Sequence, residues 1–467
     1  MDISLPRLGR RERLKQHLPA VGDWLLRHQH RVRAVQWGVL AVYAVLVAVP
    51  AALPPPLRAA HIWSDLTLAA QFAFWGLWWP FVLLSMVVVG RAWCGLFCPE
   101  GALSEFASRR GRGGTVPRWM RWRGWPVAAF VCTTVYGQLV SVYQYPRPAL
   151  LILGGSTVAA VAVGLLYGRD KRVWCRYLCP VSGVFTLLAK LAPVHFRVDP
   201  DAWAASQARH DRHLAVTCAP LVPIRTMRGA GACHMCGRCS GFRGAVELSL
   251  RSPNHEIVAV AGGQPNVWET ALILVGLMGV AVGAFLWPAS PWYVAVKQAA
   301  AGFLVDHGML WPLERSAPWW LLTDYPGRHD VLTLLDGAVL LGFIAAAAAA
   351  MGGGLLAALA VATRAAGKWS WPRLHHLAQT LIPLAGTGVF LGLSGLTVSL
   401  LRGEGLALAW VDPARLTLLA AASLWSAWLA WRVAGCYAAG WRRGWCTGAV
   451  IAAIALGATA WAQLYWG

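Results

Sequence analysis

The sequence predicts an all-α, polytopic integral membrane protein with about nine transmembrane helices. Of the 467 residues, 57% are hydrophobic and only 13% are charged, proportions that ordinary soluble domains of this length do not show. Long apolar stretches recur along the chain, and short basic segments separate them. Cysteines gather in two of those basic segments, where they form three motifs, WCGLFCPEG, WCRYLCPVSG and CHMCGRC.

About nine apolar stretches approach the roughly 20 residues that cross a hydrocarbon core of about 30 Å. The predicted spans are 35–53, 66–90, 125–145, 149–168, 268–286, 331–361, 375–400, 416–433 and 445–466. The first is long, lacks a small-residue cleavage site and is followed at once by another span, so we do not expect a cleavable signal peptide.

The basic residues predict the orientation. The N-terminal tail holds eight Lys and Arg residues, whereas the next connection has only Arg58 and the one near Tyr145 has only Arg147. By the positive-inside rule the tail is cytoplasmic. Alternation then places the basic segments 91–123, 169–266, 364–373 and 432–443 in the cytoplasm and the C-terminus in the periplasm of a bacterial inner-membrane protein. Because the net charge of +21 is spread over these loops, it indicates membrane lipid and no nucleic acid as the partner.

This topology places all three cysteine motifs in the cytoplasm, where structural disulfides are rare, so metal binding is the favoured interpretation. Thiolates also bind zinc, which stays an alternative. The CxxCxxC spacing and the two CxxxCP endings, with Pro99 and Pro180, are typical of ferredoxins. Eight cysteines supply the ligands of two [4Fe–4S] clusters. They are Cys94, Cys98, Cys175, Cys179, Cys218, Cys233, Cys236 and Cys239.

We assign Cys94, Cys98, Cys175 and Cys179 to one cluster, because their motifs follow the second and fourth spans and short loops bring neighbouring helices together. The segment CHMCGRC lacks a local fourth ligand, and Cys218 is the nearest candidate. Two alternatives stay open: Cys218 is a free loop thiol, or a CxxxCP cysteine completes the CHMCGRC set and only one cluster forms. Arg91, Arg172 and Arg176 can offset cluster charge, although the positive-inside rule explains them equally.

The chain divides into four predicted parts. Residues 1–34 form a basic cytoplasmic tail, and 35–168 a four-helix membrane domain with the first CxxxCP. Residues 169–267 form a cytoplasmic ferredoxin-like, iron–sulfur segment with the second CxxxCP and the CxxCxxC. Residues 268–467 form a five-helix membrane domain with a Trp-rich periplasmic loop at 287–330, which is either a docking surface or an aromatic belt.

The motifs WCGLFCPEGALSEF and WCRYLCPVSGVFTLLAK resemble the polyferredoxin-like membrane proteins of the NapH, NosR and CcoG types. Together with the single CHMCGRCSG segment and the long C-terminal half, they most resemble FtrD, the membrane electron-transfer subunit of bacterial Ftr iron-uptake systems. The resemblance implies electron transfer in iron uptake, with a cupredoxin-like periplasmic redox protein and an iron permease as partners. Members with two full repeats continue CxxCxxCxxxCP, whereas here SGFRG follows Cys239.

The motifs and the resemblance lead us to expect one of three functions. The leading one is an electron-transfer subunit, rather than a self-contained enzyme, that passes electrons between a periplasmic partner and a cytoplasmic or quinone pool. A second is an accessory quinol dehydrogenase for a periplasmic reductase, and a third a metal-transport or assembly protein. His375 and His376 are candidate donors to a quinone oxygen, although a solvated helix start explains them too. Cys132, Cys436 and Cys446 need no role beyond packing.

Overall fold

The computed structural model describes residues 10–56, 60–208 and 216–466, and for residues 10–16 it describes the backbone alone. The first nine residues of the predicted tail, with Arg7, and also Arg58 lie outside those ranges. Within them most residues are helical and the strands are few and short, and eight helices are long and apolar enough to cross a membrane. This confirms the predicted all-α, polytopic class. The four-part division by residue number stays a prediction.

The elements of the first membrane half follow the chain in this order: α1 (Arg10–Arg27), α2 (Gln29–Ala52), α3 (Leu66–Gln71), η1 (Phe72–Trp78), α4 (Trp79–Val89), α5 (Ala92–Leu96), α6 (Pro99–Arg109), α7 (Trp125–Leu139) and α8 (Pro146–Tyr167). The central segment contains α9 (Val173–Tyr177), α10 (Ser182–Ala189), β1 (Val194–Val198), α11 (Pro200–Ala208), η2 (Ile224–Thr226), η3 (Phe242–Gly244), β2 (Val246–Leu250), η4 (Glu256–Val260) and η5 (Ala261–Gly263).

The second membrane half contains α12 (Val267–Ala271), η6 (Leu272–Val280), α13 (Ala281–Leu286), η7 (Trp287–Ala289), α14 (Pro291–Asp306), α15 (Trp311–Glu314), β3 (Asp324–Tyr325), η8 (Pro326–Arg328), β4 (Asp330–Val331), α16 (Leu334–Ala365), α17 (Trp371–Ala378), η9 (Gln379–Leu381), α18 (Ile382–Gly403), α19 (Val411–Ala434) and α20 (Gly440–Trp466). Strand β1 pairs antiparallel with β2, and β3 with β4.

Helix α7 is shorter than its predicted span of 125–145. It has 15 residues, about 22 Å at 1.5 Å per residue, and ends at Leu139 because the chain turns at Ser141, where φ is +49°. It still connects the two ends of the bundle. Trp122, just before it, packs edge-on against Trp268, and at its far end the Leu139 carbonyl accepts the Thr323 N–H.

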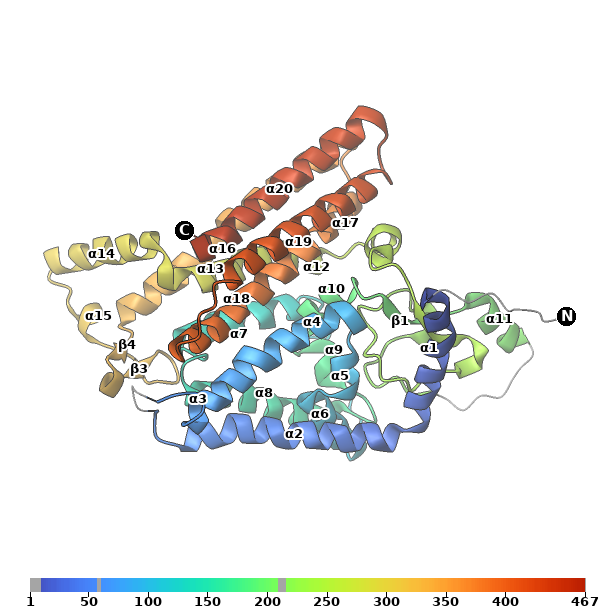
Figure 1. Ribbon diagram of the computed structural model, residues 1–467, viewed down its shortest axis with the longest axis horizontal. Coiled ribbons are helices and arrows are strands. Elements are labelled where there is room, and N and C mark those ends of the chain that lie inside the picture. Colours follow the sequence, from blue (N-terminus) through green and yellow to red (C-terminus); the bar gives the residue numbers. More distant parts are fainter. Residues whose placement is uncertain (1–9, 57–59, 209–215, 467) are drawn as a thin grey trace.

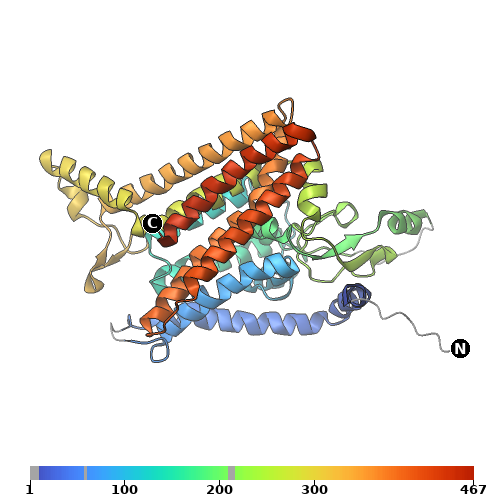
Figure 2. The same ribbon diagram turned by 45° about the horizontal axis from the view of Figure 1, so that its top comes forward.

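The connections that the sequence places on the periplasmic side meet at one end of the molecule. The Ile62 N–H donates to Glu404 at 2.6 Å, and the rings of Tyr145 and Tyr325 stack with centroids 3.6 Å apart. Figure 1 shows α14, α15, β3 and β4 at that end, with α1, β1 and α11 at the other, and Figure 2 shows the same order. Which end faces the cytoplasm stays a prediction.

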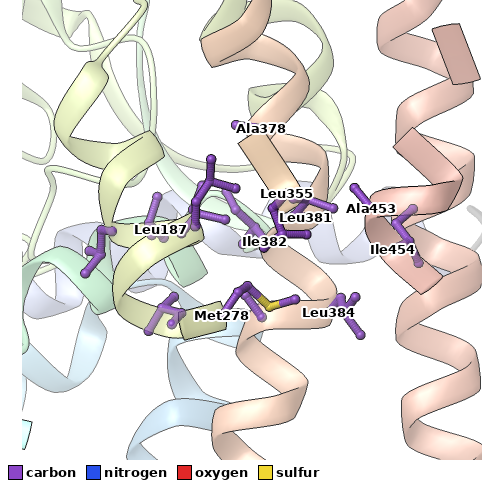
Figure 3. Packing of buried hydrophobic residues seen from close by; sticks show 14 of the residues in the cluster. Leu187, Met278, Leu355, Ala378, Leu381, Ile382, Leu384, Ala453 and Ile454 are labelled. Atoms are coloured by element: carbon purple, nitrogen blue, oxygen red, sulfur yellow. The ribbon is translucent and has the colours of Figure 1, made fainter. Parts of the chain in front are cut away.

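Small residues let the helices of the second half pack closely, as expected where lipid removes most of the hydrophobic driving force. A Cβ at Gly457 would lie 2.1 Å from the Met278 side chain, and one at Gly388 would lie 2.1 Å from Trp461. Figure 3 shows the buried cluster that results, in which Leu355, Leu381 and Ile382 come from α16, η9 and α18. This core also reaches Cys94.

Local signals fix several helix starts. Asp65 accepts the N–H groups of Thr67 and Leu68 at the start of α3, and Thr333 forms a capping box with Asp336 at the start of α16. Turns of π-helix, η1 and η6, interrupt two of the spans. Such turns are frequent at functional sites, and η1 directs Phe74, Trp75 and Trp78 toward the cavity described below.

Candidate metal centre

The two CxxxCP motifs fold in the same way. Each begins with a single helical turn, α5 or α9, and in each the N–H of the last cysteine donates to the carbonyl of the tryptophan that precedes the first. Cys98 also caps α6, since its Sγ accepts the Gly101 N–H at 3.4 Å and Pro99 opens the helix. Proline suits that place because its missing N–H is not needed there.

The cysteines of both motifs line one cavity of about 310 Å³. We call Cys94, Cys98, Cys175 and Cys179 the inner set. Burial, followed by the neighbouring charges of Cys94 and Glu100, raises the pKa of the Cys175 thiol to about 12, although Arg172 opposes the shift. Cys94 and Cys175 are buried, and Cys98 and Cys179 are partly exposed. Four thiols that line one cavity need a cationic group to exist together as thiolates.

Two buried guanidinium groups lie beside the inner set. Arg172 is 1% exposed and donates to the Cys94 carbonyl at 2.6 Å and to Glu105 at 2.9 Å. Arg91 is 4% exposed, and within the described ranges its hydrogen bonds go only to the neutral oxygens of Thr186, Gly231 and Ser182. A buried cation without a counter-charge is costly, so the site suits an anionic group.

Glu105 joins the arginines of this region. Its carboxylate contacts Arg172, Arg109 and Arg238, the last at 2.5 Å. Burial raises the pKa of Glu105, but Arg172 and Arg238 outweigh that effect and lower it to about 2. The carboxylate is therefore ionised at neutral pH and holds together a network that extends beyond the inner set, because Arg238 belongs to the CHMCGRC loop.

The remaining predicted cysteines also lie near one another. We call Cys218, Cys233, Cys236 and Cys239 the outer set. Burial is the largest cause that raises the pKa of the Cys239 thiol, and the charges of Cys233, Cys236 and Cys218 raise it further. Cys218 thus comes close to the CHMCGRC loop, as its assignment requires. Three members of this set are partly exposed, and Cys233 is buried. The assignment of ligands to either set stays a prediction.

The two sets meet through backbone contact. A Cβ on Gly95 would lie 2.0 Å from the His234 carbonyl oxygen and 3.0 Å from the Cys236 nitrogen, so only glycine fits. Helix α2 holds both loops, because Gln36 donates to the Gly95 carbonyl at 2.9 Å and Gln29 to the Cys236 carbonyl at 3.0 Å.

The cavity fits an anionic iron–sulfur group. Besides the four thiols, its walls carry three buried nitrogens without a hydrogen-bond partner in the described part of the chain: Arg91 Nε, His234 Nδ1 and Trp79 Nε1. Such donors suit the sulfur atoms of a cluster. A single metal ion is a different case. In the same part of the chain, no three His, Cys, Asp or Glu side chains lie close enough together to hold one metal ion.

Two residues of the candidate metal centre, Glu105 and His234, were not predicted. Neither carries a local signal in the sequence, because their roles depend on loops that come together only in the fold. His375 and His376, predicted quinone donors, do not line the cavity. His376 bonds to Tyr437 and to the Ile257 carbonyl, and His375 to Thr270, which accounts for both without a quinone. Cys132 and Cys436 are exposed and Cys446 is buried.

Comparison with known proteins finds an iron–sulfur family over the two segments that carry the inner set. Residues 71–123 and 150–198 match a family described as 4Fe-4S binding domain. Each matched segment contains one CxxxCP motif, whereas the outer set lies outside both. The match supports at least one [4Fe–4S] cluster.

Three curated relatives point the same way. The chain is 23% identical over 229 residues, 44% of this chain and 62% of the relative, to the putative electron transport protein YccM of Escherichia coli (strain K12). It is 28% identical over 131 residues, 24% of this chain and 18% of the relative, to the regulatory protein NosR of Pseudomonas aeruginosa. It is 33% identical over 124 residues, 24% of this chain and 43% of the relative, to the methylamine utilization ferredoxin-type protein MauN of Methylorubrum extorquens.

The chain thus covers less than two thirds of each of these relatives. No solved structure matches it. Together the matches support a polyferredoxin-like [4Fe–4S] electron-transfer family.

Proposed function

We propose that this chain is a membrane-bound [4Fe–4S] electron-transfer subunit, and not a self-contained enzyme, with one cluster on each cysteine set. The observation that carries the proposal is the convergence of two distant CxxxCP motifs on one cavity beside an unpaired buried guanidinium, Arg91. A [4Fe–4S] cluster supplies one-electron oxidation and reduction. The protein residues supply the thiolates, exclude water and offset negative charge.

The contact between the sets supports electron transfer from one cluster to the other. Gly95 allows the loops of the two sets to touch, and Glu105 joins Arg172 beside the inner set to Arg238 in the outer loop. Charges fixed this way do not need to rearrange when an electron moves, as in other preorganised sites. The partly exposed outer set is then the entry or exit on the cytoplasmic side.

By the predicted topology both sets are on the cytoplasmic side, so a carrier must take electrons across the membrane. We propose a quinone for that role. The cavity continues from the inner set to Gly137, Val142 and Tyr143, close to the opposite end of α7. Aromatic rings follow its wall. Trp93 packs on Trp78 with centroids 5.2 Å apart, and Trp75 on Tyr143 with centroids 4.8 Å apart. An apolar, aromatic-lined cavity of this kind suits a flat lipid-soluble ring.

The segment 287–330 is the proposed docking surface for a periplasmic redox protein. Trp292 is 76% exposed, Trp311 56% and Trp320 50%, and aromatic anchors of this kind are common at protein interfaces. From the resemblance to FtrD we propose a cupredoxin-like partner, an iron permease and a role in iron uptake at the bacterial inner membrane. In this setting the chain removes the electron released when ferrous iron is oxidised.

Proteoliposomes test this function. The purified protein is reconstituted, and either a reduced cupredoxin outside or a quinol in the lipid is offered as the electron donor. Reduction of the clusters by the cupredoxin supports the proposed direction. Reduction only by quinol, with no requirement for iron, supports the quinol dehydrogenase instead. The aromatic-lined cavity beside the inner set favours keeping that second candidate.

A further inference from the structure

A histidine of the outer loop reaches into the cavity of the inner set. His234 stands between Cys233 and Cys236 in the sequence, yet its side chain lines the same cavity as the inner cysteines. The cause is the contact at Gly95, which brings the His234 backbone against the first CxxxC turn. The side chain is 2% exposed.

The imidazole of His234 is incompletely bonded. In either protonation state an imidazole carries an N–H, and His234 Nδ1 has no hydrogen-bond partner in the described part of the chain. A buried polar nitrogen left unpaired destabilises the folded protein, so a missing partner is expected in the cavity.

Sulfur is the acceptor that the site offers. Glu100, the carboxylate in the cavity wall, already accepts from Ser156 at 2.6 Å and from Trp174 at 3.1 Å. Beside it stand the four thiols of the inner set. Hydrogen bonds to cluster sulfur stabilise the more negative, reduced state and so raise the reduction potential.

We propose that His234 donates an N–H hydrogen bond to a sulfur atom of the inner cluster, although it belongs to the loop that holds the outer one. The inference rests on the proposed two-cluster function. It makes His234 a tuning residue that raises the potential of the inner cluster relative to the outer. It also ties the position of the outer loop to the potential of the inner cluster.

The test uses the full-length protein, purified anaerobically in detergent and labelled with ¹⁵N only at histidine. Pulsed EPR of the reduced protein detects a nitrogen that is hydrogen-bonded to the cluster. Iron and acid-labile sulfide are measured in the same samples. Cys98→Ser and Cys239→Ser proteins identify which signal belongs to the inner and which to the outer cluster. Redox titrations are then run on His234→Phe and His234→Gln.

We expect a weak ¹⁵N coupling in the signal of the inner cluster, lost in His234→Phe. That substitution should lower the inner midpoint potential and leave the outer one nearly unchanged, and His234→Gln, which retains an N–H donor, should restore part of the shift. The matched control is His195→Phe. His195 Nδ1 is equally buried and unpartnered in the described residues, but His195 does not line the cavity.

Absence of histidine coupling in the unmodified protein, or an unchanged inner potential in His234→Phe, would overturn the inference. If His234→Phe fails to assemble, the labelled unmodified protein still decides the matter. Failure of the proposed function looks different, because the unmodified protein would then lack iron and sulfide altogether.

Discussion

The inner and outer cysteine sets hold the same number of thiols in very different surroundings. The inner set is formed by two repeated turns, lines a cavity bounded by residues of η1, α4, α7 and α8, and has the buried Arg91 and Arg172 beside it. The outer set takes three members from one loop and is partly open to solvent. The comparison teaches that two sites with the same four thiol ligands can differ in their properties, because the buried charges around them differ. Charge placed in a buried site acts far more strongly than the same charge near water.

Removal of one thiol should affect the two sets unequally, and this is the largest effect that we expect. Cys98→Ser should abolish the inner cluster and leave the buried Arg91 cation without its anion, at a cost of about 3–5 kcal/mol of stability. Cys239→Ser should remove only the outer cluster, or about half of the iron. Iron and sulfide analysis and thermal unfolding in detergent measure both effects. Equal destabilisation by the two substitutions would remove the distinction between the sets.

Glu105 should matter to both sets, because it joins their arginines. Glu105→Gln leaves Arg172, which is 1% exposed, without its counter-charge and should lower stability by about 3–5 kcal/mol. Glu247→Gln is the control at an exposed position and should change stability by less than about 0.5 kcal/mol. Thermal unfolding compares the three proteins. A Glu105→Gln protein as stable as the parent would show that the network has no structural role.

The contact between the sets can be widened at Gly95. Gly95→Ala places a Cβ against the His234 carbonyl, and the strain should cost about 1–3 kcal/mol and move the loops apart. Gly155→Ala, in α8, meets nothing within 4 Å and serves as the control. The magnetic interaction between the two reduced clusters, measured by EPR, should weaken only in Gly95→Ala. An unaltered interaction there would mean that the contact does not set the distance between clusters.

Acid should weaken the same network, with a smaller effect. The pKa of Glu105 is about 2 in the folded protein against an ordinary 4.5, so its contribution is complete above about pH 4.5 and lost as pH falls through 2. By pH 4 the loss should be about 1 kcal/mol. The stability difference between the parent and Glu105→Gln, followed by thermal unfolding from pH 7 to pH 4, should shrink accordingly. A constant difference would contradict the low pKa.

The fold was largely predictable because long apolar stretches leave few alternatives to membrane helices. The exception, α7, ends at Leu139 because the chain turns at Ser141, although Val140 and Val142 beside that turn are as apolar as residues of a span. The π-helical turns and the pairing of β1 with β2 were not predicted, since they arise from packing between distant segments.

The convergence of the inner set on one cavity was predictable for a different reason. These candidate ligands lie in two short motifs, each with its own proline, so the local sequence carries the information. Glu105 and His234 could not be found in this way. Glu105 stands in a basic segment that reads as solvent-exposed, and only the folded arrangement buries it among arginines. In the sequence, His234 is only one of the two residues that separate Cys233 from Cys236. The close contact with Gly95, which brings His234 to the cavity, exists only in the fold.

The central claim is that each cysteine set holds one [4Fe–4S] cluster. The most direct test is to purify the protein anaerobically in detergent and to measure iron, zinc and acid-labile sulfide per chain, together with EPR of the dithionite-reduced form. We predict about eight iron and eight sulfide per chain and the signals of two interacting reduced clusters. About four of each, or zinc in place of iron, would contradict the claim.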